Sequence, residues 1–437
     1  MTIDSSWVKL LKTCEASAFS DTLQSYPEAV FIDGQIKLMK AEYIDTWNLF
    51  LEKQFVIPIQ RHFNQGARVV VLAFDNYAHV PVSKAPTQRK RNIQKRTYQF
   101  ETGSSLPKNM PENWNEAMRH RGFKVEVIKM VLEYFTRNFC EIIDASTQSV
   151  VLDFEGAPIV LGKKIDFPTT FPTTSKRGEC DIKAFNYNWF RDILLDSTDG
   201  DYIPMALLQT NACLELKDDD MAESSRPKTN MYVRRIKIRV DKKRKAGETK
   251  REFEYVNIQT LGKFLKQEFK KSPSAAMDFA LMCSISGCDF TVRLPILGPL
   301  RLWQRRHTWT LQETEKAGAC VEHIFRYAIL NYMGYFKKHH QMSYKEVEKE
   351  TSRDTLSAKY DRMVNQIRKS NVSGVILNKL WSSSRLLAHC KNVAWTCAYW
   401  TQLDQYPDPL EITEEGNESV WGFVTQKKGV VFENNNA

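Results

Sequence analysis

The run ILLDSTDGD, over Ile193–Asp201, constrains the fold of this chain more than any other stretch. A short apolar strand leads directly into Asp196, Asp199 and Asp201. Charged groups next to a core lose hydration, so this strand end calls for a partner of opposite charge. A divalent cation held by carboxylates is one such partner. An ordinary Asp/Gly turn explains the same residues, but acids in similar places elsewhere favour the cation.

Two more apolar runs end on an acid, AVFID at Asp33 and RVVVLAFD at Asp75. Between them, apolar residues from Tyr43 to Phe55 recur at helical spacing, and we expect Pro58 to end that helix. Continuous apolar strands joined by a helix are typical of a parallel sheet covered on both faces. Ligands bind beyond the carboxyl ends of such strands. The sequence therefore predicts an α/β fold with both acids at its binding edge.

Composition narrows the function. Lys and Arg number 62 against 52 Asp and Glu, and the net charge of +10 favours an anionic partner such as nucleic acid. The sequence contains no apolar run of membrane-spanning length, so we expect no membrane association and an intracellular protein, with the nucleus favoured over the cytoplasm. The nine cysteines are scattered, which predicts reduced thiols instead of a zinc site or a disulfide framework.

Two segments are strongly basic. Ser83–Arg96 holds six Lys or Arg residues and no acid, and its place after a strand-end acid favours phosphate contact over a solvated surface helix or a localisation signal. Alternating residues over Val233–Val240 and Glu252–Ile258 predict a hairpin with a basic tip. The candidate nucleic-acid-binding residues in the two segments are Lys84, Arg89, Lys90, Arg91, Lys95, Arg96, Lys242, Lys243, Arg244 and Lys245.

The acids at predicted strand ends, or on a helix opening beside them, form one candidate site. They are Asp33, Asp75, Glu179, Asp181, Asp199, Asp201 and Asp289. Seven carboxylates in one cleft repel one another unless cations neutralise them. Mg²⁺ prefers a few carboxylates plus phosphate oxygens, and we expect two ions, for which Mn²⁺ could substitute. Two metals about 4 Å apart activate water and stabilise the leaving oxygen in phosphodiester cleavage. These acids therefore predict a metal-dependent nuclease.

The order and spacing of the acids resemble the structure-specific 5′ nucleases of the flap endonuclease and XPG superfamily. The matching motifs are FIDG at Asp33, AFDN at Asp75, ECD at Glu179 and Asp181, STDGD at Asp199 and Asp201, and SGCDF at Asp289. The resemblance implies a PIN-like parallel sheet with helices on both faces, a helical arch and a helix-two-turn-helix. It also implies that all seven acids are catalytic and bind metal, and that Arg301, Arg305 and Arg306 bind duplex backbone.

The resemblance implies a domain organisation too. Residues 1–309 would form the catalytic domain, with the arch over 76–125, a basic β-hairpin insertion over about 205–258 and the helix-two-turn-helix over about 284–309. Residues 310–437 would be a helical C-terminal extension of unknown role. Within it, the aromatic stretch Ala394–Tyr406 favours core packing over base stacking. The family's glycine-rich turn is reduced to Leu297-Gly298-Pro299, which departs from the pattern.

By this resemblance we expect a monomeric Mg²⁺-dependent 5′ nuclease acting on DNA in repair or replication, as a flap endonuclease or exonuclease. Two alternatives stay open. The same carboxylates serve a 5′ exoribonuclease or a PIN-type endoribonuclease equally well. A relative that binds nucleic acid without cleaving it is the other, although the full set of seven acids argues against it. The protein partners and the choice between flap, junction and end cleavage do not follow from the sequence.

Overall fold

The protein is described here from a computed structural model. The structure describes residues 5–41, 43–76, 98–101, 103–168, 171, 178–211, 230–240, 249–269, 275–288, 291, 294, 297–306, 317–336, 353–369, 380–401, 423–426 and 429–432.

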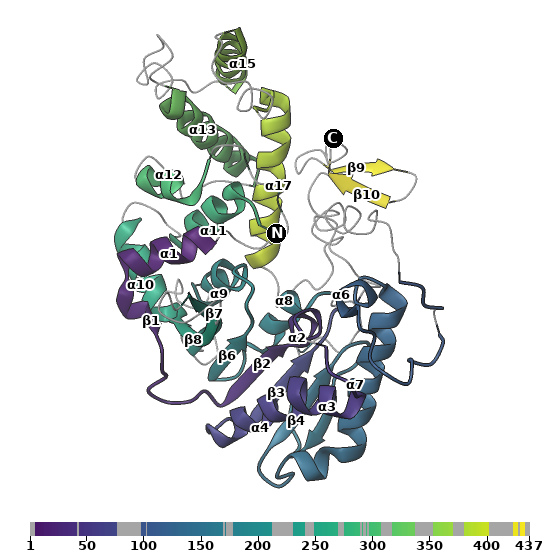
Figure 1. Cartoon of the computed structure of the whole chain (residues 1–437). Coiled ribbons are helices and arrows are strands. Elements are labelled where there is room, and N and C mark those ends of the chain that lie inside the picture. The colour runs from purple at the N-terminus through teal and green to yellow at the C-terminus, as the bar shows by residue number, and fades with distance from the viewer. Residues whose placement is uncertain are drawn as a thin grey trace.

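An eight-stranded sheet in the order β1-β8-β7-β6-β2-β3-β4-β5 organises the chain (Figure 1). Its five central strands run parallel: β7 (Asn230–Val240), β6 (Asp192–Asp196), β2 (Ala29–Asp33), β3 (Val69–Ala73) and β4 (Ser149–Asp153). The outer strands pair antiparallel with their neighbours: β5 (Ile159–Gly162), β8 (Thr249–Asn257) and β1 (Phe19–Ser20). The predicted α/β class with a mainly parallel sheet is confirmed.

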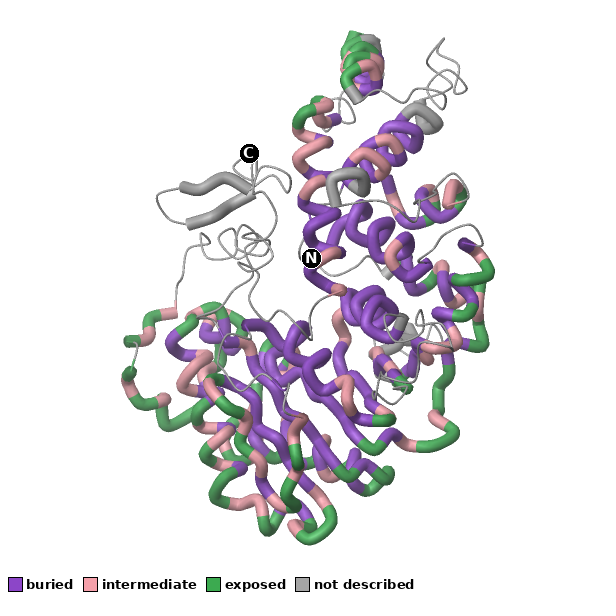
Figure 2. The backbone as a smooth tube through the Cα atoms, turned by 180° about the vertical axis from the view of Figure 1, so that it is seen from behind, coloured by how far each residue is buried: buried purple, intermediate pink, exposed green. Residues whose placement is uncertain are grey.

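Alternate side chains along the central strands pack into two separate hydrophobic cores, one on each face of the sheet. On β2, Phe31 belongs to one core and Val30 and Ile32 belong to the other. The core that includes Val30 is covered by α3 (Trp47–Leu51), α4 (Ile57–Asn64), α6 (Trp114–Ala117) and α7 (Arg121–Ile142). The core that includes Phe31 is covered by α1 (Ser5–Cys14), α9 (Tyr202–Asn211), α10 (Ile258–Glu268) and α11 (Ala275–Ser286). Burial on both faces explains why the strands are apolar throughout (Figure 2).

Two helix boundaries differ from the sequence prediction. Pro58 does not end a helix: a π-helical turn over Glu52–Val56 joins α3 to α4, and Pro58 lies in the first turn of α4. Proline has no N–H to donate, and it follows directly on the π-helical turn, where the regular α-helical hydrogen-bond ladder is already interrupted. Asn113 and Glu116 have the spacing of a capping box, which predicts one helix from Asn113 to about Phe139, but the structure divides it into α6 and α7. The side chain of His120, and not that of Asn113, caps the longer helix by accepting a hydrogen bond from Phe123 N–H.

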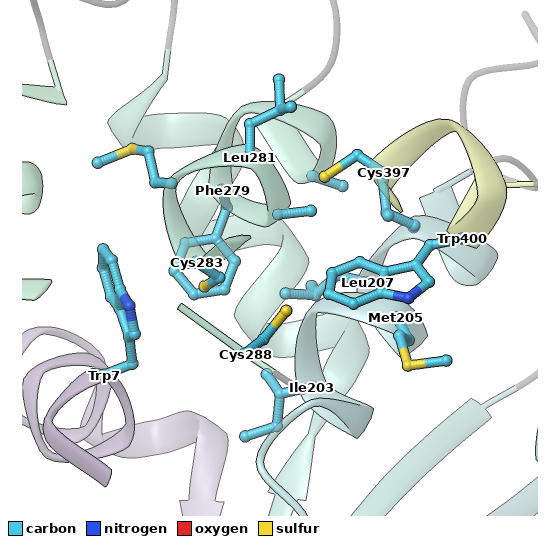
Figure 3. Packing of buried hydrophobic residues seen from close by; sticks show 14 of the residues in the cluster. Trp7, Ile203, Met205, Leu207, Phe279, Leu281, Cys283, Cys288, Cys397 and Trp400 are labelled. Carbon is cyan, nitrogen blue, oxygen red and sulfur yellow. The ribbon is translucent and has the colours of Figure 1, made fainter. Parts of the chain in front are cut away.

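Helices of the C-terminal third pack on the same core as α9 and α11. They are α12 (Pro299–Gln304), α13 (Ala317–Phe336), α15 (Arg353–Lys369) and α17 (Ser383–Thr401), and a short hairpin follows as β9 (Phe423–Gln426) and β10 (Gly429–Phe432). Cys397 and Trp400 of α17 point into the cluster formed by α9 and α11 (Figure 3). Trp395, Tyr399 and Trp400 are buried, so the core prediction for this aromatic stretch is confirmed as far as residue 401, and residues 402–406 lie outside the described residues. Among the described helices, none is long and apolar enough to cross a membrane.

Candidate active site

Acids from three neighbouring strands gather at one edge of the sheet. Strands β2, β3 and β6 are parallel, so their carboxyl ends lie along the same edge. Asp33 is the last residue of β2, Asp75 follows β3 by two positions, and Asp199 follows β6 by three. The topology therefore places these acids together although they are far apart in sequence.

Asp33 is held in an environment that is costly for a negative charge. Its side chain is buried, and its Oδ1 accepts a hydrogen bond of 2.9 Å from Ile36 N–H, which caps α2 (Gly34–Met39). Its Oδ2 lies 3.4 Å from both Ser197 Oγ and Tyr202 Oη. Burial raises the pKa of Asp33 to about 8, and the charges of Asp75, Asp199 and Asp181 add to the rise. The buried carboxyl thus lies among like charges that its hydrogen bonds do not offset.

A glycine permits the close approach of Asp33 to β3. A Cβ placed on Gly34 would lie 2.6 Å from the carbonyl oxygen of Ala73 and 2.6 Å from the ring of Phe74. Contacts that short do not occur for real side chains, and one of the atoms is backbone. Gly34 therefore lets α2 begin directly against the end of β3, next to Asp75.

A short helix, α8 (Cys180–Lys183), brings two more acids to the edge. Glu179 occupies its N-cap position and Asp181 its first turn, and both side chains are buried. The N–H of Cys180 donates a 3.0 Å hydrogen bond to Asp75 Oδ1. This bond joins the loop after β3 to the start of α8, so the acid-bearing segments are positioned against each other.

Asp199 and Asp201 lie in the tight loop between β6 and α9. Asp199 Oδ1 accepts a 2.9 Å hydrogen bond from Asp201 N–H, and Asp199 N–H donates to Ser197 Oγ at 3.2 Å. Asp201 is fully buried. Burial raises the pKa of the Cys283 thiol on α11, and the charge of Asp201 contributes to that rise. Asp201 therefore lies close to α11, whose C-terminal end leads toward the SGCDF motif.

The structure thus brings together four of the predicted acids, which are coupled through the pKa of Asp33: Asp33, Asp75, Asp181 and Asp199. Glu179 and Asp201 are their buried chain neighbours, and Asp289 lies outside the described residues. Among the described side chains, no three or more His, Cys, Asp or Glu residues are already arranged to hold a metal ion. The coupled donors are all carboxylate oxygens, which suit Mg²⁺, and their excess negative charge fits a cation chemically.

Asp196, the first acid of the run Ile193–Asp201, does not belong to the candidate site. Asp196 continues the Leu194 face of β6, where Arg234 binds it through Nε at 2.8 Å and Lys37 lies 3.3 Å away. Burial alone would raise the pKa of Asp196, but Arg234, Lys37 and His62 together hold it well below its usual value. Asp196 is therefore a neutralised structural acid, and the strand alternation visible in the sequence separates it from Asp33.

The sequence did not predict the buried ion pair between Lys183 and Asp153, which lies next to the candidate site. The ammonium of Lys183 on α8 lies 3.1 Å from Asp153 Oδ1, and both side chains are almost fully buried. Tyr187 Oη donates a 2.8 Å hydrogen bond to the other oxygen of Asp153. The sequence contains one indication of this pair, because Asp153 ends the apolar strand SVVLD just as Asp33 ends AVFID. No neighbouring sequence pattern identifies Lys183 as the partner of Asp153.

Two of the candidate phosphate-binding arginines hold α12 in place. Arg306 Nε donates to Glu268 Oε2 at 2.8 Å, and its guanidinium stacks 4.5 Å from the ring centroid of Trp303. Arg305 Nη1 donates to the carbonyl of Leu330 at 2.9 Å. Arg301 is partly exposed. The candidates in the predicted arch and hairpin tip lie outside the described residues: Lys84, Arg89, Lys90, Arg91, Lys95, Arg96, Lys242, Lys243, Arg244 and Lys245.

The strands that carry the hairpin project past the acidic edge. Strand β7 pairs with β6 only up to Arg234, opposite Asp196, and then continues to Val240 in the same direction. Over that length its partner is β8, with Arg235 opposite Glu254 and Val240 opposite Thr249. The β7–β8 ribbon therefore extends beyond the carboxyl ends of β2, β3 and β6, where the acids gather.

Comparison with known proteins adds a distant likeness to a solved structure. No family model matches the chain, and no curated protein sequence matches it. Among solved structures, the chain is similar to the catalytic core of Rad2 in complex with DNA substrate, at 11% identity and a TM-score of 0.38, covering 96% of this chain and 99% of that one. A likeness at this TM-score does not support a functional assignment, and the function proposed below rests on the site.

Proposed function

We propose that this protein is a metal-dependent nuclease that hydrolyses phosphodiester bonds in DNA. The observation that carries the proposal is the convergence of Asp33, Asp75, Asp181 and Asp199 at one edge of the parallel sheet. Burial raises the pKa of the Asp33 carboxyl to about 8, and the charges of the other three acids add to the rise. Carboxylates from separate strands and a helix, converging at the binding edge of a parallel sheet, supply the donors of a divalent-cation site.

In this proposal the residues at the acidic edge of the sheet have separate roles. Asp33, Asp75 and Asp181 hold the cations, and Asp199 completes the set from the loop after β6. Two Mg²⁺ ions, when bound, supply water activation and charge neutralisation at the scissile phosphate. The side chains of Ser197 and Tyr202 orient Asp33, and the N–H of Cys180 orients Asp75.

The basic segments would hold the substrate backbone. The β7–β8 ribbon extends from the sheet on the side of the acids, and the sequence places four consecutive basic residues, Lys242–Lys245, between its two strands. Cationic side chains there can neutralise phosphates on either side of the cleavage position. This arrangement favours a polymeric phosphodiester over a small phosphate ester.

The test is direct cleavage. Purified protein with Mg²⁺ is mixed in parallel with 5′-labelled flap, gapped, single-stranded DNA and RNA substrates, and products are sized by electrophoresis. We expect cleavage of DNA and a loss of about 10²–10³ in rate for Asp75→Asn, because one preorganised electrostatic partner is removed. Asp166→Asn, at an exposed acid paired with exposed Lys164, is the matched control and should cleave at the wild-type rate.

The outcomes separate the alternatives. Preferential RNA cleavage would assign the same site to a ribonuclease. Nucleic-acid binding without cleavage of any substrate would overturn the enzyme assignment in favour of a binding protein. Equal rates for Asp75→Asn and wild type would remove Asp75 from the site.

A further inference from the structure

Three consecutive residues leaving β3 are bonded to one short segment around α8. Phe74 O accepts a 2.8 Å hydrogen bond from the Lys183 ammonium, and Asp75 Oδ1 accepts one of 3.0 Å from Cys180 N–H. Asn76 N–H donates to Gly178 O at 2.5 Å. On the α8 side, two of these three bonds come from the backbone of Cys180 and Gly178, and the bond to Phe74 comes from the side chain of Lys183.

The ammonium that makes this bond is placed where it reaches two strand ends at once. Besides Phe74 O, Lys183 Nζ donates to Phe154 O at 2.6 Å and lies 3.1 Å from Asp153 Oδ1. Phe74 follows β3, whereas Asp153 and Phe154 are at the end of β4. The acceptors around the ammonium are the backbone carbonyls of Phe74, Phe154 and, at 3.4 Å, Asp153, together with the Asp153 carboxylate. Its three donors are therefore all used, and the buried charge is satisfied.

Stability alone does not account for a charge in this position. Replacing a buried ion pair by apolar side chains of similar volume is often neutral or stabilising, because both charges lose their hydration. An apolar side chain could fill the space between α8 and the strands, but it could not bond three groups in fixed directions. The feature specific to Lys183 is that it fixes α8 relative to β3 and β4.

We infer that Lys183 is a positioning residue of the active site, which sets the separation between Asp75 and the acids of α8, Glu179 and Asp181. The inference rests on the proposed function, because a separation matters only where these acids share a ligand. Lys183 does not contact the reacting atoms. It acts through the carbonyl of Phe74, one bond before Asp75 in the chain, and through its own helix.

The physical requirement is one of precision. Groups that bind one ion or stabilise one transition state must be held within about 0.5 Å of their working positions by their supporting shell. Removing a supporting partner of a metal ligand typically lowers metal affinity or activity by about 10–100-fold. We expect a loss of that size from Lys183→Met, which keeps an unbranched apolar chain as far as Cε and removes the ammonium with its donors.

The experiment compares three variants of the full chain with wild type. Lys183→Met removes the tie to Phe74. Tyr187→Phe is the matched control, since it removes a buried hydrogen bond to Asp153 but none to Phe74. The double variant Lys183→Met with Asp153→Leu removes both charges, so no unpaired buried charge is left. Each protein is measured for its Tm, for Mn²⁺ affinity by titration of free Mn²⁺ in an electron paramagnetic resonance experiment, and for kcat on a cleaved DNA.

The double variant separates positioning from folding. We expect it to regain the wild-type Tm while its Mn²⁺ affinity and kcat stay about 10–100-fold below wild type, whereas Tyr187→Phe keeps the wild-type Mn²⁺ affinity. If Lys183→Met does not fold, the double variant decides alone. Recovery of both Tm and Mn²⁺ affinity in the double variant would overturn the inference and leave Lys183 a structural residue. A wild-type protein that neither binds Mn²⁺ nor cleaves would refute the proposed function and this inference with it, which is distinct from a failure confined to the variants.

Discussion

The carboxylate of Asp33 caps helix α2 through the N–H of Ile36, at 2.9 Å, while it lies among the other acids of the sheet edge. One oxygen is thus fixed by the helix, and the other is directed to Ser197 and Tyr202. A side chain that is both a helix cap and a candidate metal ligand has its rotamer set by the fold. This dual role makes the ionisation of Asp33 a stability determinant that can be measured without substrate.

The first prediction is a pH dependence of the metal-free protein. The pKa of Asp33 is about 8 in the folded chain, above its ordinary value of 3.8. The folded state therefore binds the proton more tightly, and the stabilisation is complete below about pH 4 and is lost as the pH rises to about 8. One such proton changes the unfolding free energy by about 1.4 kcal/mol per pH unit within that window.

Chemical unfolding in a chelator at several pH values between about 5 and about 8 measures this effect. Asp33→Asn should have a flatter pH dependence than wild type and should be the more stable of the two at about pH 8. Adding Mg²⁺ should restore stability to wild type more than to the variant. Identical pH dependence of the two proteins would show that Asp33 is ionised at little cost in the folded chain.

The second prediction concerns Gly34→Ala. The added Cβ would lie 2.6 Å from Ala73 O, so the start of α2 must move away from β3. Overpacking of this kind typically costs about 1–3 kcal/mol, and the movement should also separate Asp33 from Asp75 and lower the cleavage rate. Gly298→Ala is the matched control for stability, because a Cβ there meets nothing within 4 Å. Wild-type cleavage by Gly34→Ala would show that α2 and β3 can separate without consequence.

Much of the sheet could be predicted from local pattern. The apolar runs around Phe31 and Val71 are buried on both faces, so they read as continuous strands, and parallel topology followed from the helix between them. Helix ends were less predictable. Pro58 was expected to end a helix because proline usually does, but a wide turn just before it placed the ring in a first turn, a choice made by packing around Phe55 and not by propensity.

The candidate site was predictable only in part, for a related reason. Acids such as Asp33 and Asp75 are recognisable in the sequence because each ends an apolar strand. Lys183 is not, since a lysine in a short polar helix reads as solvent-exposed, and only the fold shows that Asp153, 30 residues earlier, is its partner. The reverse holds for Asp196, which resembles a metal ligand in the sequence because it ends an apolar strand. Its neutralising partner Arg234 is 38 residues later in the chain, so the sequence does not show the pair.

The third prediction concerns substrate binding by the ribbon. Replacing Lys242, Lys243, Arg244 and Lys245 by Ala should weaken DNA affinity, and the slope of log affinity against log salt should fall by about 0.9 for each phosphate that the variant no longer neutralises. The same change at Lys84, Arg89, Lys90, Arg91, Lys95 and Arg96 tests the predicted arch. Arg137→Ala, at an exposed arginine on α7, is the control. Unchanged salt slopes would make these runs solvated surface or targeting segments.

The last prediction assigns a task to the C-terminal helix α17. The carbonyl of Trp400 accepts a 2.6 Å hydrogen bond from Gln209 Nε2 on α9, and the Trp400 ring is fully buried against that helix (Figure 3). Because α9 begins one residue after Asp201, removing the Trp400 ring should loosen the loop that carries Asp199 and Asp201. Trp400→Ala should therefore cost about 3–5 kcal/mol of stability and should weaken Mn²⁺ binding as well.

A comparison with Phe135→Ala separates the two effects. Phe135 is equally buried but lies on α7, in the core on the opposite face of the sheet, so its loss should cost a similar amount of stability. Measured well below the Tm of each variant, Mn²⁺ affinity should fall in Trp400→Ala and stay at the wild-type value in Phe135→Ala. Equal Mn²⁺ affinities in the two variants would mean that α17 stabilises the fold without supporting the site. A selective loss in Trp400→Ala would instead make the C-terminal extension a structural part of the catalytic unit, because the loop that it supports carries two of the candidate ligands.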